Sequence, residues 1–253
     1  MSGWSKGAVI VTGGSRGIGA SIVRALAVRG VPVCINHRDS AADAERLRIE
    51  AEALGVEASV VQADMGREED IVALFEEAQQ RHGRLWGLVN NAGFVGQAGR
   101  RVDEADAAVL EASFRINAVG PILCTREMLR RISTRHGGQG GRIVNISSIA
   151  KRTGSPNDWV DYAASKGALD TFTLGVAREV ATEGVQVNGV APGLVATEIH
   201  ARAGAPDRIE RMSAAVPMKR AGTPEDIAAV AVWLLLDAPD YVHGTTIDVA
   251  GGV

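Results

Sequence analysis

Short runs of apolar, mostly β-branched residues alternate with longer segments of helical periodicity along the whole chain. The short runs, which are typical of buried strands, occupy residues 8–12, 32–36, 57–62, 85–90, 142–147, 185–190 and 245–249. Helical patterns fill the segments between them, at 20–29, 41–54, 68–82, 105–133, 162–182 and 224–236. Because parallel strands need crossover connections, this alternation predicts one α/β domain over residues 1–253, a doubly wound, seven-stranded, mostly parallel sheet with helices on both faces.

A glycine-rich turn, Gly-Gly-Ser-Arg-Gly-Ile-Gly at residues 13–19, directly follows the first predicted strand and leads into a helical pattern. In this position Gly13 permits a tight turn, Gly17 lets a ligand approach the backbone, and Gly19 lets the helix pack close to the strand. Free backbone N–H groups and the positive end of the helix dipole would then favour a phosphate. The order of strand, turn and helix predicts a dinucleotide site, which the glycines alone would not.

Tyr162 and Lys166 lie four residues apart at the start of another predicted helix, so they share one helix face. A fixed ammonium group beside a phenol favours phenolate and moves the phenol's pKa from about 10 toward neutral pH. A tyrosine in that setting can act as a general acid and base. The alternative is a tyrosine packed under the helix and a solvated lysine, and the spacing by itself does not decide between the two.

Composition narrows the classes of partner. The 253 residues are 46% hydrophobic and carry a formal charge of −3 with no basic block, which argues against nucleic acid or an anionic membrane and for a small-molecule ligand. The N-terminal segment 1–6 lacks a signal-peptide core, and no apolar run approaches the roughly 20 residues that span a bilayer, so we expect a cytoplasmic protein. The histidines show no paired ligand spacing, which predicts no metal site, and Cys34 and Cys124 are expected to be buried free thiols.

Residues with distinctive chemistry stand just after the predicted strands. In a doubly wound sheet, ligands bind at the carboxyl ends of the strands. The residues at those ends are, in chain order, Gly13, Arg38, Asp64, Asn91, Ser148 and Pro192. We therefore expect one edge of the sheet to hold the functional site.

Five motifs together resemble the classical short-chain dehydrogenase/reductase family over nearly the whole chain. They are the Thr-Gly turn at 12–19, Asn-Asn-Ala-Gly at 90–93, Asn-Ile-Ser-Ser at 145–148, the Tyr162 and Lys166 pair, and Pro-Gly at 192–193. The resemblance implies a Rossmann domain and an NAD(P)-dependent oxidoreductase that acts on CH–OH groups. It lies nearest to the 3-oxoacyl carrier-protein reductases and the glucose-dehydrogenase-like members.

By this resemblance, Asn117, Ser148, Tyr162 and Lys166 would form a catalytic tetrad. Ser148 would donate a hydrogen bond to the substrate oxygen and Tyr162 would exchange the proton. Lys166 would lower the tyrosine pKa and bind the nicotinamide ribose, while Asn117 would hold a water that links the lysine to solvent. Ser147 is the neighbouring candidate, but its side chain points to the opposite face of the strand, and the spacing from Ser148 to Tyr162 is closer to that of the family. Taken alone, Asn117 would be an ordinary polar residue of a helix.

The resemblance also implies which residues hold the coenzyme. Asp64 would accept a hydrogen bond from the adenine amino group, or else cap the next helix. The turn at 192–197 would hold the nicotinamide carboxamide and fix the ring face that delivers hydride. The expected coenzyme contacts are Gly13, Ser15, Arg16, Gly17, Ile18, Gly19, Arg38, Asp64, Met65, Asn91, Ala92, Gly93, Tyr162, Lys166, Pro192, Gly193, Val195 and Thr197.

The end of the second predicted strand bears on coenzyme choice. NAD-specific relatives place an acidic side chain there to bind the adenosine ribose, whereas this chain has Asn36 and His37. Arg38 and Arg16 are suited to a 2′-phosphate because guanidinium makes paired hydrogen bonds to phosphate oxygens. Asp39 competes with this interpretation, but we expect it to cap the helix that begins near residue 41. The sequence thus predicts NADP(H), with NAD(H) as an alternative coenzyme.

Substrate and assembly are less strongly specified. Residues 194–217 have the composition of a mobile lid with a short polar helical stretch, and Trp159 in the preceding loop either stacks on a substrate or supports the lid. We expect interconversion of a secondary alcohol and a ketone on a small or medium substrate. Carrier-protein-linked 3-oxoacyl reduction is the alternative function, and a non-catalytic dinucleotide-sensing protein is a third possibility.

The sequence also bears on assembly. The apolar helical segments 105–133 and 162–182 and the apolar C-terminal run suggest a homotetramer.

Overall fold

The computed structural model describes residues 5–253, so most of the N-terminal segment 1–6, considered above for a targeting signal, lies outside the described residues. Within them the chain forms one sheet of seven strands in the order β3-β2-β1-β4-β5-β6-β7. Every pairing is parallel, as the alternation of strands and helices predicts. The strands are β1 (Ala8–Val11), β2 (Val33–His37), β3 (Ala58–Gln62), β4 (Leu85–Asn90), β5 (Gly141–Ile146), β6 (Val185–Pro192) and β7 (Thr246–Val249).

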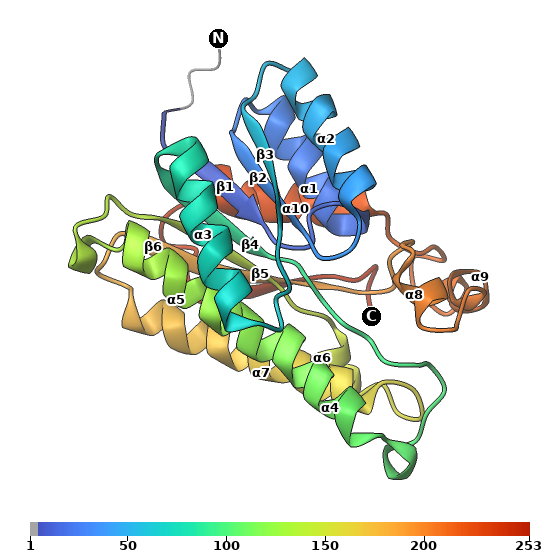
Figure 1. Cartoon of the computed structure of the whole chain (residues 1–253). Helices are drawn as coiled ribbons and strands as arrows, with labels where there is room; N and C mark the ends of the chain where they lie inside the picture. The colour runs from blue at the N-terminus through green and yellow to red at the C-terminus, as the bar shows by residue number, and fades with distance from the viewer. Residues whose placement is uncertain (1–4) are drawn as a thin grey trace.

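Two layers of helices cover the sheet, one on each face (Figure 1). The first layer is formed by α1 (Gly17–Val28), α2 (Ala41–Ala53) and α10 (Pro224–Leu236), and the second by α3 (Glu68–His82), α4 (Ala107–Phe114), α5 (Gly120–Ile132) and α7 (Val160–Glu179). Two apolar cores result, because the central strands bury side chains on both faces. Leu26, Leu47 and Leu235 belong to one core, and Phe75, Met128 and Val176 to the other.

The helix predicted over 105–133 differs most from the expectation. It consists of α4, a π-helical turn at Arg115–Val119, and α5, with a short 3₁₀ helix at Val102–Glu104 before it. Pro121 stands in the first turn of α5, where its missing N–H removes a bond to the preceding turn. A Cβ at Gly120 would lie 2.5 Å from the Met65 carbonyl oxygen, so the backbone passes very close to the loop after β3. The π turn places Asn117 in the interior.

The stretch Ala107–Ile132 is the one helix within residues 5–253 that is long and apolar enough to cross a membrane, by length and composition only. An 18-residue window within it has a mean hydropathy of 1.3. In the fold this stretch packs on β4, α3 and α7 as part of the cover of the sheet. The helix therefore contributes to the second core and leaves part of its apolar surface uncovered.

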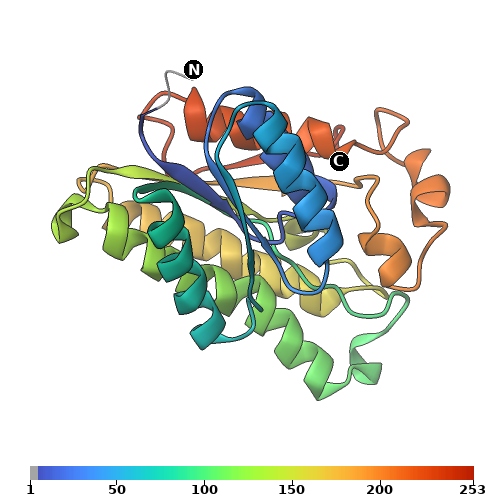
Figure 2. The same ribbon diagram turned by 45° about the horizontal axis from the view of Figure 1, so that its top comes forward.

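The carboxyl ends of the strands face a separate group of short helices. These are α6 (Ala150–Thr153), which follows β5, and α8 (Ile199–Arg202) and α9 (Arg208–Ser213), which follow β6. Another short helix, a 3₁₀ turn at Thr134–His136, precedes β5 and does not belong to this group. In both ribbon views α8 and α9 stand out to one side of the sheet (Figures 1 and 2). Backbone bonds from Gly222 N to Leu194 O (2.8 Å) and from Ala196 N to Gly222 O (2.9 Å) join the two ends of this segment. Residues 194–222 therefore form a loop closed at its base, and the segment 194–217, predicted to be a lid, lies within it.

Candidate active site

A cavity of about 820 Å³ opens at the carboxyl ends of the strands. All of the residues that the sequence places at those ends line it, from Gly13 after β1 to Pro192 at the end of β6. Of the expected coenzyme contacts, Gly19 alone does not line the cavity, and of the expected catalytic residues Asn117 alone does not. The parallel sheet thus brings together residues from segments that are far apart in the sequence.

The glycine turn has the shape of a phosphate cradle. Gly13 and Gly17 adopt φ values of 58° and 53°, a left-handed conformation that favours glycine. Gly19 lies beneath the turn, where a Cβ would approach the Gly13 carbonyl oxygen to 2.4 Å and Asn91 Nδ2 to 2.6 Å. Its role is therefore close packing of α1 against the turn. The open turn, the N-terminus of α1 and the adjoining cavity fit a dinucleotide, whose pyrophosphate would lie over Gly17.

Side-chain amides hold this cradle in place. Asn91 Nδ2 donates to the carbonyls of Thr12 (2.9 Å) and Gly13 (3.0 Å), while the Thr12 hydroxyl accepts from the backbone N–H of Asn91 and of Ala92. Asn36, buried in β2, accepts from Gly13 N at 3.0 Å and donates to the Ala63 carbonyl at 3.0 Å. These bonds fix the ends of β1, β2, β3 and β4 relative to one another. Sequence reasoning missed the role of Asn36, although an amide inside an apolar strand is the signal that could have indicated it.

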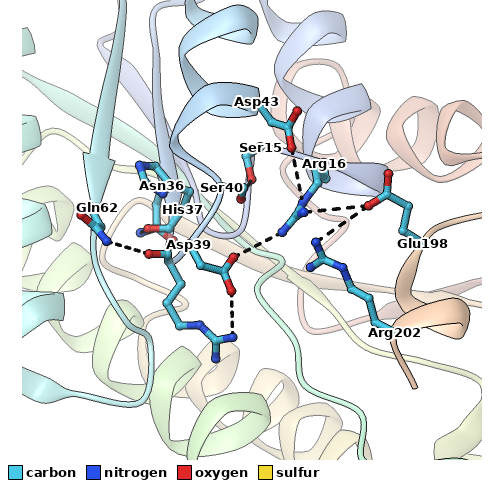
Figure 3. Close-up of polar contacts among 11 residues, drawn as sticks. Ser15, Arg16, Asn36, His37, Asp39, Ser40, Asp43, Gln62, Glu198 and Arg202 are labelled. Carbon is cyan, nitrogen blue, oxygen red and sulfur yellow. Dashed lines mark hydrogen bonds and ion pairs between the residues drawn. The ribbon is translucent and has the colours of Figure 1, made fainter. Parts of the chain in front are cut away.

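Neither aspartate expected as a possible helix cap acts as one. Asp64 accepts from Gly66 N at 2.8 Å, while α3 begins after Arg67. Asp39 accepts from Arg16 at 3.3 Å and from Arg38 at 3.1 Å, while Ser40 is the N-cap residue of α2 (Figure 3). The expectation for Asp39 was therefore wrong, because two guanidinium groups offer a carboxylate stronger hydrogen bonds than a helix end does. Their hydrogen bonds and charge hold the pKa of Asp39 below its ordinary value, Arg38 first.

Tyr162 and Lys166 share one face of α7, as their spacing predicts. Lys166 Nζ lies 5.8 Å from the centre of the Tyr162 ring and donates to the Ile146 carbonyl at 2.7 Å. Burial lowers the pKa of Lys166 to about 8. The pKa of Tyr162 is raised by burial, which the hydrogen bond with Ser148 opposes. The structure therefore favours the protonated phenol, whereas the sequence argument emphasised a lowered pKa.

Ser147 and Ser148 follow β5 directly, and their side chains make different contacts. The Ser147 side chain is buried, and its hydroxyl lies 3.4 Å from the Lys166 carbonyl. Ser148 accepts from Ala150 N at 3.1 Å and lines the cavity with Tyr162, whose pKa the Ser148 hydroxyl lowers against the effect of burial. Of the two serines, Ser148 is the one placed beside the phenol.

Both polar atoms of the Asn117 side chain form hydrogen bonds. Its Oδ1 accepts from Phe94 N at 2.7 Å, and its Nδ2 donates to the Phe94 carbonyl at 2.8 Å and to Ser165 Oγ at 3.0 Å. Because the amide is fully engaged and buried, it ties the loop after β4 to α7 one residue before Lys166. This is a positioning role, and the π turn supplies the close approach that it needs.

Trp159 lines the cavity and contacts the segment that follows β6. Its Nε1 donates to the Gly96 carbonyl at 2.9 Å, and the side chain is buried. The Arg208 guanidinium, from α9, lies 4.1 Å from the ring centre, and the ring of His200, from α8, is stacked at 6.1 Å. Arg208 also pairs with Asp158 beside the tryptophan. Trp159 thus contacts residues of both α8 and α9. Burial lowers the pKa of His200.

Two further polar contacts escaped the sequence analysis. Asn90 Nδ2 donates to Asn145 Oδ1 at 2.8 Å, joining β4 to β5 in the interior. Arg100 donates to the buried carboxylate of Asp161 at 2.7 Å, beside Tyr162 at the start of α7. Both contacts join residues far apart in sequence, so a local pattern could not have indicated the partner.

The cysteines lie away from this chemistry. Cys34 and Cys124 are buried and free, as expected, and burial raises the pKa of Cys34 to about 11 and that of Cys124 further. A thiol with so high a pKa is a poor nucleophile. Over residues 5–253 no three His, Cys, Asp or Glu side chains gather in a group that could hold a metal ion.

Comparison with known proteins agrees with the site. The family profile described as enoyl-(acyl carrier protein) reductase matches residues 13–253. An uncharacterized oxidoreductase of Escherichia coli (strain K12), YgfF, is 43% identical over 96% of this chain and 98% of its own length. A 3-oxoacyl-(acyl-carrier-protein) reductase of Synechocystis is 34% identical over 100% of this chain and 99% of its own. An NADPH-dependent aldehyde reductase-like protein of Arabidopsis thaliana, described as chloroplastic, is 34% identical over 96% of this chain and 92% of its own length. The chain belongs to the classical short-chain dehydrogenase/reductase family of NAD(P)(H)-dependent oxidoreductases.

Proposed function

We propose that the protein is an NADP(H)-dependent oxidoreductase that interconverts a secondary alcohol and a ketone on a small or medium substrate. The observation that carries the proposal is that Tyr162, Ser148 and Lys166 line the same cavity as the glycine cradle, with Lys166 Nζ 5.8 Å from the centre of the phenol ring. When bound there, a nicotinamide coenzyme supplies or accepts the hydride.

The residues of the chain handle the proton and the substrate oxygen. In the reducing direction the protonated phenol of Tyr162 donates its proton to the carbonyl oxygen, which Ser148 holds by a hydrogen bond. The Lys166 ammonium then stabilises the phenolate that remains, at a distance of 5.8 Å from the ring centre. Asn117 holds the loop after β4 against the first half of α7, so that Tyr162 and Lys166 stay in position. In the oxidising direction the same phenolate removes the alcohol proton.

The preference for NADP(H) rests on Arg16 and Arg38, which line the cavity beside the end of β2. A charge-assisted bond of about 1.5–3 kcal/mol from one of them would favour NADPH over NADH by roughly tenfold or more. Asp39 opposes this because it already binds both guanidinium groups. Measuring kcat/KM with both coenzymes tests the proposal, and Arg38→Ala should remove most of the preference. A wild-type preference for NADH would contradict it.

Carrier-protein-linked 3-oxoacyl reduction is the second candidate, favoured by the similar reductase of Synechocystis. A screen of NADPH oxidation with free ketones, aldoses, acetoacetyl thioesters and a carrier-bound acetoacetyl group separates the two. Turnover that requires the carrier-bound form would assign the second function. Turnover of free ketones at equal kcat/KM would assign the first.

We also propose that the protein works as a homotetramer, without nucleic acid or a membrane, in the cytoplasm. Phe114 on α4, Ile122 on α5 and Leu174 on α7 are each about two-fifths exposed, which suits pairing of these helices with a second copy. Part of the C-terminal tail is covered within the protomer, since Gly251 accepts from Met218 N at 3.1 Å. Light scattering should give about four times the chain mass, and a 26.5 kDa particle at micromolar concentration would contradict the tetramer.

A further inference from the structure

Arg16 stands among three carboxylates that come from three different segments (Figure 3). Its Nη2 lies 3.3 Å from Asp39 after β2, and its Nε lies 3.9 Å from Asp43 on α2. Its Nη1 lies 3.9 Å from Glu198, the residue that leads into α8 of the lid. The arginine of the glycine turn is therefore linked to the lid as well as to the adenosine end of the cavity.

The three carboxylates are not held equally. Asp39 also bonds to Arg38 at 3.1 Å, and Asp43 also pairs with Arg46 at 2.6 Å. The other partner of Glu198 is Arg202, at 3.9 Å, and the Glu198 side chain is 71% exposed. Glu198 is thus the carboxylate that an incoming anion can most easily displace from Arg16.

We propose that Glu198 couples the lid to the adenosine end of the coenzyme, because a 2′-phosphate and the Glu198 carboxylate compete for the Arg16 guanidinium. The proposal rests on the proposed use of NADP(H). A phosphate bound to Arg16 would bring two anions within a few ångströms of one another across the guanidinium, where like charges repel even with solvent screening. Glu198 must then either leave Arg16 or weaken the binding of the phosphate.

Two consequences follow from this competition. Glu198 lowers the preference for the 2′-phosphorylated coenzyme, so it is a specificity residue although it belongs to the lid. In return, the 2′-phosphate weakens the attachment of the lid, since binding linkage is reciprocal. Arg202 N donates to the Glu198 carbonyl at 3.1 Å and Ala203 N to the Ile199 carbonyl at 3.0 Å, so these two amides report on opening of α8.

The test uses adenosine 2′,5′-bisphosphate and AMP, which share the adenosine end and differ in the 2′-phosphate. Their affinities are measured by calorimetry for the wild type, Glu198→Gln and Glu210→Gln. Glu210 is a matched control because it lies on lid helix α9, is exposed, and has no ion pair within residues 5–253. The same pair of ligands is then measured for Arg16→Gln and for the double variant with Glu198→Gln.

We expect Glu198→Gln to tighten the bisphosphate by about two- to fivefold, the range of one exposed ion pair, and to leave AMP unchanged. Glu210→Gln should change neither, and Glu198→Gln should have no effect in the Arg16→Gln background. In hydrogen exchange of the wild type, the amides of Arg202 and Ala203 should exchange faster with the bisphosphate than with AMP. In Glu198→Gln they should exchange equally fast with both.

Failure of the coupling through Glu198 and failure of the NADP(H) preference give different results. If the wild type binds the bisphosphate more tightly than AMP but Glu198→Gln behaves like Glu210→Gln, the coupling through Glu198 is wrong and the NADP(H) preference stands. A Glu198→Gln effect that persists without Arg16 also overturns the coupling. If the wild type does not distinguish the two ligands, the proposed preference for NADP(H) is wrong and the competition falls with it.

Discussion

Gly19→Ala tests whether close packing beneath the glycine turn limits coenzyme binding. The added Cβ would lie 2.4 Å from the Gly13 carbonyl oxygen, about 1 Å inside the 3.4 Å at which ordinary contact begins. It would also lie 2.6 Å from Asn91 Nδ2 and 2.9 Å from Gly14 Cα. None of these atoms is the free end of a flexible side chain, because Asn91 is held by two bonds to the turn. The turn itself must therefore move.

The size of the effect follows from what the movement breaks. Overpacking of this kind costs about 1–3 kcal/mol, and each of the two Asn91 bonds contributes about 0.5–1.5 kcal/mol if it is lost. Alanine in a helix gains about 1 kcal/mol over glycine, which offsets part of this. We expect the free energy of unfolding to fall by about 2–3 kcal/mol and the affinity for NADP to fall at least about tenfold, since the pyrophosphate would lie on the displaced backbone.

Urea unfolding and calorimetric titration with NADP measure the two effects. Gly175→Ala is the control, because it makes the same substitution within helix α7 and its added Cβ meets nothing within 4 Å. The control should bind NADP as the wild type does. Wild-type affinity in Gly19→Ala, with an unchanged urea midpoint, would refute the argument that the turn has no room for a Cβ.

Three further changes address proton transfer and the lid. Tyr162→Phe should lower the rate of chemistry by about 10²- to 10⁴-fold with little change in coenzyme affinity, and single-turnover rates above a tenth of the wild type would remove Tyr162 from its role. Because burial lowers the pKa of Lys166 to about 8, its ammonium is present below that pH and lost above it, so the pH profile of kcat/KM for ketone reduction should decline above about pH 8. Lys166→Arg should abolish that limb, and a limb that persists would belong to another group. Arg208→Gln removes the contact with Trp159 and leaves Asp158 without its cation, so KM for the ketone should rise by about three- to tenfold while coenzyme affinity stays the same.

Periodicity and glycine placement were sufficient for the fold and for most of the cavity. Each strand was predicted to within a few residues, because apolar runs between helices have one stable arrangement in a parallel sheet. The site then follows from the rule that all strand ends meet at one edge. The π turn within the predicted helix 105–133 was missed, because no local pattern in the sequence indicates it.

The errors and omissions at the site share a physical cause. Asp39 was assigned to a helix end because sequence shows only its neighbours in the chain, whereas the structure gives it two guanidinium groups. Trp159 could be a stacking platform or a support, and the structure shows its contacts with Arg208 and His200, which the sequence does not indicate. Arg16, Arg208 and His200 each lie more than 20 residues away in the sequence from the residue that they contact. Arg38 is the exception, because it is adjacent to Asp39.

Three asparagines join the backbone segments around the site, and of these the sequence indicated Asn91 and Asn117 but not Asn36. Asn36 and Asn117 each accept one backbone N–H and donate to backbone carbonyls of other segments, while Asn91 donates to two carbonyls of the glycine turn. A carboxylate in place of Asn36 or Asn117 would keep the acceptor and lose the donor, leaving a buried charge beside carbonyl oxygens. The site therefore needs amides, because only a group with both a donor and an acceptor can join two backbones whose polar atoms are otherwise buried. The precision of the cradle and of the tyrosine pair thus depends on neutral side chains that take no direct part in the proposed proton transfer.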